Sequence, residues 1–265
     1  QQLLFAYPHF SQVNITNVAI GGQRYHSLQV KGQRRYRNGL AAQGSYTWGK
    51  SLERVSTLNA QDVTLDDLTR TSLEQRLVEF DIPHTFAAAV SYELPFGKGR
   101  PWLSSSNGFV NAIVGGWNIN AIMSFQRGFP LAISTAATVT PGLAYRALRP
   151  NIVGDVRTTA TSKQDRIRAW FNPAAFAAPG LFQLGNAGRT IPSLRGPNQA
   201  TVDLALHKNF QITERIRTQF RLEAFNALNR ANFGLPGTNL GGVGFGVIDS
   251  TADPRNVQLA VRVYF

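Results

Sequence analysis

The stretch that decides the fold is "NVQLAVRVYF", residues 256–265. Apolar residues occupy one parity of this stretch: Val257, Leu259, Val261, Val263 and Phe265. The other parity is mostly polar: Gln258, Ala260, Arg262 and Tyr264. A two-residue period of this kind is typical of a β-strand whose two faces meet different surroundings. The sequence therefore predicts a strand that places an apolar face against one medium and a polar face against another.

The composition favours large surfaces that face something other than water. Only 16% of the 265 residues are charged, whereas soluble domains average about 25%. No apolar run approaches the roughly 18 residues that a membrane helix needs, so any contact with lipid would have to be made by strands. Cysteine is absent and the four histidines are far apart in sequence. These residues predict no metal site, no cofactor site and no enzyme chemistry.

The net charge of +12 raises the question of a nucleic-acid partner. The basic residues are scattered along the chain, and the only tight group lies in "QRRYRNG", residues 33–39, just before a turn. This arrangement favours a solvated strand end or a contact with anionic headgroups. Recognition of nucleic acid is not expected.

The alternating pattern recurs along the chain. "RYHSLQVKGQRRYR" (24–37) and "GLAAQGSYTWGKS" (39–51) flank Asn38-Gly39, a strong signal for a two-residue hairpin turn. Further alternating segments are "HTFAAAVSYELP" (84–95), "GGWNINAIMSFQRG" (115–128), "TVDLALHKNFQI" (201–212) and "RTQFRLEAFNALN" (217–229). Ile122 is the one misfit in the alternation of residues 115–128, and this strand is expected to run on through "FPLAIST", residues 129–135. A short helix is expected at "FVNAIV", residues 109–114.

The connections between the strands also alternate between short and long. Most are short at one end of the strands, apart from the stretch between Pro95 and Trp117, and long at the other, at about 52–82, 136–198 and 231–254. The strand segments reach about ten residues, which matches the roughly 9–11 needed to cross a bilayer at a tilt. We expect an all-β antiparallel transmembrane barrel with long outer loops and mostly short periplasmic turns. The three long loops are the best candidates for contact with a ligand.

The two parities predict two kinds of site residue. Aromatic residues near the strand ends are expected to form interfacial girdles: Trp48 and Phe125 at the long-loop ends, Trp117 and Phe210 at the short-turn ends. Charged residues in mid-strand are expected to face a hydrated lumen: Lys31, Asp203, Arg221, Glu223 and Arg262. Alternation alone also fits a soluble β-rich binding protein, whose rings would fill a packed core.

Several segments carry a family resemblance. "FDIPHTFAAAVSYELPFGKG" (80–99), "GGWNINAIMSFQRGFPLAI" (115–133), "LHKNFQITERIRTQFRLEA" (206–224) and "FNALNRANFG" (225–234) resemble the C-terminal barrel portion of TonB-dependent outer-membrane transporters of the Oar-like group common in acidobacteria. The resemblance extends from about residue 25 to residue 265. It implies a barrel of ~22 strands with a plugged lumen, of which residues 1–265 supply about eight. The family's plug domain and TonB-box peptide have no counterpart in these residues.

The resemblance implies a location and partners. The expected location is the bacterial outer membrane, and the expected function is uptake of a scarce ligand or an oligomeric nutrient. The implied partners are the lipid bilayer, the barrel-assembly machinery, an unidentified ligand, and TonB through an upstream segment. Tyr264 and Phe265 resemble the C-terminal signal that the assembly machinery recognises. A small self-contained barrel or surface-assembly protein without active transport is the alternative, since eight strands suffice to close a small barrel.

Overall fold

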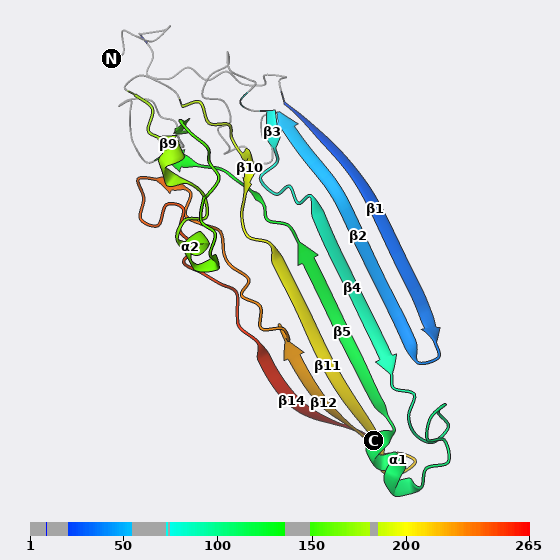
Figure 1. Ribbon diagram of the computed structural model, residues 1–265. Coiled ribbons are helices and arrows are strands. Elements are labelled where there is room, and N and C mark those ends of the chain that lie inside the picture. Colours follow the sequence, from blue (N-terminus) through cyan, green and yellow to red (C-terminus); the bar gives the residue numbers. More distant parts are fainter. Residues whose placement is uncertain (1–8, 10–20, 55–72, 74, 136–148, 181–184) are drawn as a thin grey trace.

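One large antiparallel sheet dominates the computed structural model, which describes residues 9, 21–54, 73, 75–135, 149–180 and 185–265 (Figure 1). Its strands are β1 (Gly22–Arg37), β2 (Leu40–Arg54), β3 (Gln75–Leu77), β4 (His84–Glu93), β5 (Trp117–Gln126), β11 (Gln199–Gln211), β12 (Arg217–Phe225) and β14 (Asn256–Tyr264). The seven long strands follow one another in the order β1-β2-β4-β5-β11-β12-β14, and the short β3 pairs with β2. This confirms the predicted antiparallel strands, whereas β3 lies in the stretch at about 52–82 that was expected to be a loop.

The hairpin between β1 and β2 follows from its turn residues. Asn38 and Gly39 both have positive φ, 56° and 81°. A type I′ turn requires positive φ at both central positions, and its twist matches that of the flanking strands. The predicted hairpin is confirmed, and its register runs from the Arg37–Leu40 pair to the Gly22–Arg54 pair with a bulge near the turn.

The strand registers bring the apolar parities of all seven long strands onto one face of the sheet, here called the apolar face. On this face, midway along β12, Leu222 lies opposite Leu206 on one side and Leu259 on the other. Large side chains on this face stay exposed on several strands: Leu28, Val30, Trp48, Phe86, Phe125, Phe220, Leu259 and Val261. A contiguous apolar surface of this extent marks a site of contact with lipid or with another protein. The opposite side of the sheet carries the other parity and is called the polar face.

The sheet does not close into a barrel. Among the described residues, β1 pairs only with β2, and β14 pairs only with β12. The two outer strands therefore leave unpaired backbone groups at both edges of the sheet. A closed barrel made by this chain alone, as the small-barrel alternative requires, is not what the described strands form.

The predicted continuation of β5 through residues 129–135 is wrong. β5 ends at Gln126, and the chain then leaves the sheet. Gly128 packs so closely against Gly196 that a Cβ atom at position 128 would collide with the Gly196 carbonyl oxygen. The following residues instead form β6 (Pro130–Leu131), which pairs with β10 (Ile191–Arg195), and β7 (Ser134–Thr135), which pairs in parallel with β13 (Asn239–Leu240).

The predicted helix near residues 109–114 is confirmed as α1 (Gly108–Val114). Asn107 begins it, because its side-chain Oδ1 accepts a hydrogen bond from the Val110 N–H at 2.9 Å. Among the described residues, no helix has both the length and the apolar character needed to span a membrane.

The long connections form a packed unit at one end of the sheet. We call this unit the loop cap and define it as the described residues 127–135, 149–180, 185–198 and 226–255 (Figure 1). Besides β6, β7, β10 and β13, it contains β8 (Asn151–Ile152), α2 (Lys163–Arg168), a 3₁₀ turn (Pro173–Ala175) and β9 (Phe176–Ala177). It has its own hydrophobic core: Leu131, Ile133, Val156, Phe171, Ala175, Phe176, Ile191 and Leu194. The stretch expected to be a plain loop at 136–198 is therefore folded wherever it is described.

Candidate functional site on the polar face and beneath the loop cap

A row of polar side chains crosses the polar face from β4 to β11. Asn118 Nδ2 donates to Ser91 Oγ at 3.4 Å, and Asn120 Nδ2 lies 2.6 Å from Asn118 Oδ1. The same Asn120 nitrogen lies 3.2 Å from His207 Nδ1 on the next strand. Neighbouring strands thus place side chains of one parity within reach of each other, as cross-strand pairs require.

The row continues from β11 to β14 through Glu223. His207 Nε2 lies 3.6 Å from Glu223 Oε1, and Arg221 Nε lies at the same distance from this oxygen. Gln258 Nε2 donates to Glu223 Oε2 at 2.6 Å. The polar face therefore carries one connected network over five strands, with a carboxylate held among cationic and amide donors.

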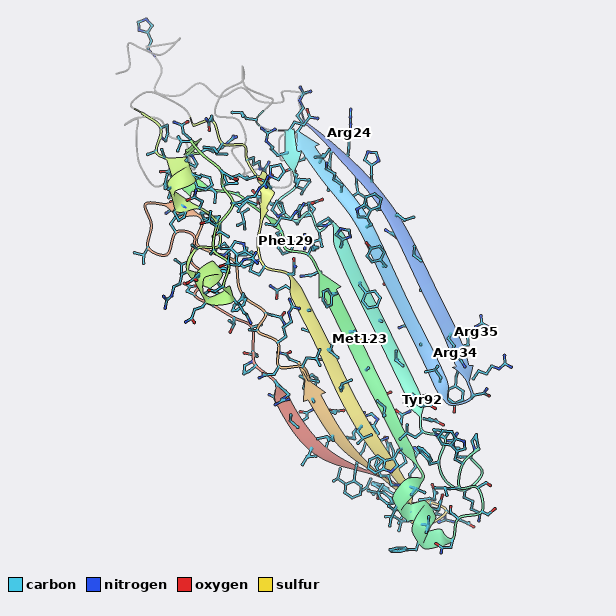
Figure 2. The ribbon with its side chains drawn as sticks, viewed as in Figure 1. Arg24, Arg34, Arg35, Tyr92, Met123 and Phe129 are labelled. Carbon is cyan, nitrogen blue, oxygen red and sulfur yellow. The ribbon has the colours of Figure 1, made fainter. Side chains whose placement is uncertain are left out.

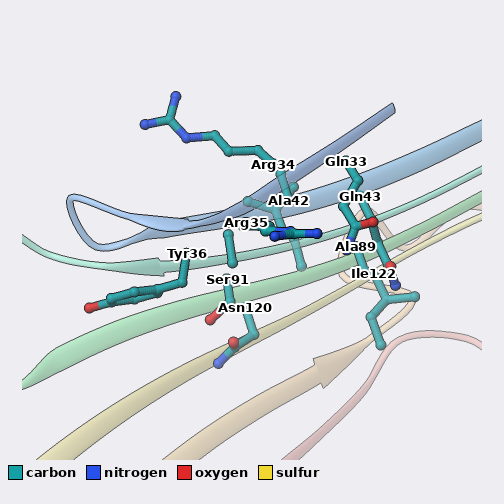
Figure 3. A pocket seen from close by; sticks show the side chains of 13 residues that line it. Gln33, Arg34, Arg35, Tyr36, Ala42, Gln43, Ala89, Ser91, Asn120 and Ile122 are labelled. Atoms are coloured by element: carbon teal, nitrogen blue, oxygen red, sulfur yellow. The ribbon is translucent and has the colours of Figure 1, made fainter. Parts of the chain in front are cut away.

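A shallow hollow of about 560 Å³ lies on the polar face beside this network, between β1, β2, β4 and β5. Ser91 and Asn120 line it together with Ile122 (Figure 3). In Figure 3 the side chain of Arg34 points away from Asn120 and Ile122. Ile122, the residue that breaks the parity of β5, is thus an exposed apolar contact point on an otherwise polar surface.

A second hollow, of about 710 Å³, lies nearer the loop cap and is lined by Gln23, Tyr25, Gln29, Thr47, Ser51, Phe80, Asp81, Ile82 and Thr85. The rings of Tyr25 and Phe80 are more than half exposed. The Asp81 carboxylate has partners within the protein, because it accepts hydrogen bonds from the Ser51 N–H and from Arg195. The remaining polar groups are amides and hydroxyls, which suit a neutral polar ligand that also stacks on aromatic rings.

The loop cap is joined to the sheet by a buried ion pair. Arg195 Nη2 lies 2.6 Å from Asp81 Oδ2, and the Asp81 side chain is only 2% exposed. Arg195 Nη1 also donates to the carbonyl oxygens of Asp81 and Gly128, at 3.0 and 3.1 Å. The Trp170 indole N–H donates to the Arg195 carbonyl oxygen at 2.7 Å. One guanidinium therefore connects the loop cap, the end of β5 and the segment before β4.

A second group of ionic contacts lies at the same junction. Arg189 Nη1 lies 3.2 Å from Glu53 Oε1 at the end of β2, and Arg189 Nε lies 3.6 Å from Glu79 Oε1. Thr190 Oγ1 donates to the Leu77 carbonyl oxygen in β3 at 2.7 Å. The loop cap is thus fixed over the sheet end by charged contacts as well as by packing.

The residues predicted to face a lumen share the polar face but do not form one site. Arg221 and Glu223 are in contact, whereas Lys31 lies on the edge strand β1 and Arg262 on the opposite edge strand β14. Asp203 has a structural role, because its Oδ1 accepts a hydrogen bond from the Asn226 N–H at 2.8 Å, where β12 ends. That the polar face lines a lumen stays a prediction.

The four predicted interfacial aromatic residues all belong to the apolar parity. Trp48 lies opposite His84, and Phe125 lies opposite Phe86, both toward the loop cap. Trp117 lies opposite Lys208 near the short turns, and there the Phe210 ring meets the Phe220 ring edge-on at 5.5 Å. Their place at a membrane interface stays a prediction.

Lys208 interrupts the apolar parity of β11 between Leu206 and Phe210. Its side chain is buried, and Nζ donates to the Ile113 carbonyl oxygen at 3.1 Å and to the Gly115 carbonyl oxygen. Nζ also lies 5.1 Å from the Trp117 ring centroid and 4.8 Å from that of Phe210. A lysine at an apolar-parity position was the signal in the sequence that pointed to this contact.

Charged side chains lie at both ends of the sheet. Arg24 lies at the loop-cap end of β1, and Arg34 and Arg35 lie at its hairpin end (Figure 2). Near the hairpin, Tyr36 Oη donates to Glu93 Oε2 at 2.7 Å, and Arg100 Nη2 donates to the same oxygen at 2.6 Å. The hydrogen bond to Glu93 raises the pKa of Arg100 above its ordinary value.

The last two residues of the chain have different surroundings. The guanidinium carbons of Arg217 and Arg262 lie 4.8 and 5.3 Å from the centroid of the Tyr264 ring. Phe265 is fully exposed. The role of these two residues as an assembly signal stays a prediction.

Comparison with known proteins identifies the type of domain. A family model described as "Outer membrane beta barrel domain" matches residues 1–258. No curated protein matches the chain. Among the residues that the structure describes, no three histidine, aspartate or glutamate side chains gather as a metal site.

Proposed function

Because the chain belongs to the outer-membrane β-barrel domain family, we propose that it forms the C-terminal wall of a TonB-dependent receptor of the Oar-like group, which takes up a scarce ligand or an oligomeric nutrient. The family match points to the bacterial outer membrane. The observation that carries the proposal is the open sheet with unlike faces. Unpaired strand edges are not tolerated in lipid, so strands outside this sheet must complete a barrel. A barrel of ~22 strands with a plugged lumen would contain these additional strands beside the described sheet.

In this proposal, the polar face lines the ligand's route through the membrane. The network around Glu223 and the two hollows offer hydrogen-bonding groups along this face. The loop cap lies at the end of the sheet at which the ligand arrives (Figure 1). The chain contributes binding groups rather than catalytic ones, and it uses no cofactor.

The other partners follow from the same proposal. TonB contacts a segment outside residues 1–265 and supplies the energy for transport. The barrel-assembly machinery recognises the strand that ends in Tyr264 and Phe265, where the terminal ring is accessible. Lipid surrounds the apolar face, and nucleic acid is not a partner.

Two alternatives fit the sheet less well. A small self-contained barrel would need β1 to pair with β14, and these strands are the opposite edges of the described sheet. A soluble binding protein would need a second layer over the apolar face, yet Leu259 is 80% exposed and the Trp48 ring is more than half exposed. Both observations favour a lipid-facing segment of a larger barrel.

The proposal predicts the size and a partner of the native protein. In outer membranes, an antiserum against this chain is expected to detect a polypeptide larger than 29.1 kDa. The purified native protein is expected to bind the periplasmic domain of TonB saturably, measured by isothermal titration calorimetry. The chain of 265 residues alone is the control and is expected not to bind. A native polypeptide of 29.1 kDa without affinity for TonB would establish the small-barrel alternative.

A further inference from the structure

The segment 94–116 between β4 and β5 differs from its neighbours at the short-turn end of the sheet. There, β1 and β2 are joined by Asn38-Gly39, and β11 and β12 by residues 212–216. The segment 94–116 contains α1 and extends beyond the strand ends (Figure 1). Four of its large apolar side chains are more than half exposed, and we call them the apolar tip: Trp102, Leu103, Phe109 and Ile113.

Hydrogen bonds within the segment hold the apolar tip in place. The Gly97 N–H donates to the Trp102 carbonyl oxygen at 2.9 Å, and the Trp102 N–H donates to the Pro95 carbonyl oxygen at 3.0 Å. The Lys98 N–H donates to Asn111 Oδ1 at 2.6 Å, which connects the turn to α1. The exposed rings are therefore presented by an ordered frame.

Leu103 adds a sign of strain in this frame. Its φ is 61°, in the left-handed region that bulky residues rarely adopt. Such a conformation is energetically unfavourable and persists where the surrounding structure imposes it, often at functional sites. Here it keeps an exposed leucine beside Trp102 at the turn.

The C-terminal end of α1 rests against the apolar face of the sheet. The Trp117 indole N–H donates to the Ile113 carbonyl oxygen at 2.9 Å. Lys208 donates to the same oxygen and to the Gly115 carbonyl oxygen. Because Trp117 and Lys208 both belong to the apolar parity, the C-terminal end of α1 lies on the side of the apolar face, just past the strand ends.

Basic groups accompany the apolar tip. Lys98 is exposed in the turn before Trp102, and Arg100 is half-exposed beside Glu93. Aromatic side chains with lysine and arginine nearby are typical of segments that lie at the boundary between headgroups and acyl chains. Anionic phosphate groups of lipids complement this charge.

We propose that the segment 94–116 lies in the headgroup region of the periplasmic leaflet, with the apolar tip inserted among the acyl chains and Lys98 near the lipid phosphates. This proposal rests on the lipid-facing orientation of the apolar face. The occupant of the surface is the phospholipid leaflet itself, which is continuous with the lipid around the strands. The segment would anchor the short-turn end of the sheet at a fixed depth.

The absence of cysteine from the chain makes a direct test possible. Phe109→Cys and Ile113→Cys are introduced into the native protein in a background without other cysteines, each receives an environment-sensitive fluorophore, and the labelled protein is reconstituted into phosphatidylethanolamine–phosphatidylglycerol vesicles. Ser105→Cys, an exposed polar position in the same segment, is the matched control. Lipids with a nitroxide near the headgroup are expected to quench the labels at 109 and 113 several-fold more than lipids with a deep nitroxide. The label at 105 is expected to respond mainly to aqueous iodide.

A label at Leu222→Cys separates two kinds of failure. If lipid quenches the label at 222 but iodide alone quenches those at 109 and 113, the segment lies in water and the proposal for it is wrong. If no lipid quencher reaches 222, the orientation of the sheet is wrong and both proposals are overturned. Labels at 109 and 113 that are shielded from lipid and iodide in native membranes would show that a protein covers the segment instead.

Discussion

Asp81→Ala is expected to loosen the loop cap from the sheet and to lower the free energy of unfolding by about 3–5 kcal/mol. The Asp81 side chain is almost fully buried, and its carboxylate accepts hydrogen bonds from Arg195 and from the Ser51 N–H. Removing it leaves the Arg195 guanidinium without its counter-charge in a part-buried position. The large cost arises from this uncompensated charge rather than from the net value of the pair.

The measurement for Asp81→Ala is urea unfolding of the native protein in lipid vesicles, combined with limited proteolysis of the loop cap. Asp155→Ala is the matched control, because Asp155 lies 3.8 Å from Arg157 in a pair whose side chains are 72% and 75% exposed. Surface pairs of this kind contribute little, so the control is expected to behave like the wild type. Equal stability and equal protease resistance of the two variants would show that the ion pair does not fix the loop cap.

Leu222→Arg is expected to lower the stability of the native protein in lipid vesicles by about 2–4 kcal/mol, the cost of an arginine on a lipid face near the bilayer midplane. Leu222 lies on the apolar face midway along β12, between Leu206 and Leu259 on the neighbouring strands. A guanidinium at this position would have to enter the hydrocarbon or distort the bilayer around it. Urea unfolding in vesicles measures the loss.

The control for Leu222→Arg places the same charge on the other face. Ala205 is opposite Glu223 in the register of β11 and β12, so Ala205→Arg adds a cation beside a carboxylate on the polar face. Its stability is expected to change little. If both variants lost the same stability, or if Ala205→Arg lost more, the assignment of the two faces would be wrong.

Local patterns in the sequence predicted the strands, because the period of two and the turn residues act over short distances. Asn38-Gly39 determined the first hairpin through its backbone preferences, and the alternation around Leu222 and Leu259 determined which residues share a face. The short helix at residues 108–114 was predicted as well. The closure of the sheet could not be predicted, since it depends on the pairing of strands that are far apart in sequence.

The loop cap and the details of the site depend on contacts between distant residues. Arg195 and Asp81 are separated by 114 positions, and neither has a neighbouring sequence that identifies the other. The helices and strands of the loop cap are too short to show a hydrophobic period. The sequence of this folded unit therefore looks like that of an irregular loop. The end of β5 depends on the close approach of Gly128 to Gly196, which no pattern around residues 126–135 reveals.

Lipid contact along β12 is the most direct test of whether the apolar face meets the membrane. Single cysteines at Gln219, Phe220, Arg221 and Leu222 carry nitroxide labels, and electron paramagnetic resonance measures collisions with oxygen, which concentrates in lipid, and with a water-soluble nickel complex. The labels at positions 220 and 222 are expected to collide mainly with oxygen, and those at 219 and 221 mainly with nickel. Uniform collision with nickel at all four positions, or alternation in the opposite phase, would contradict a lipid-facing apolar face.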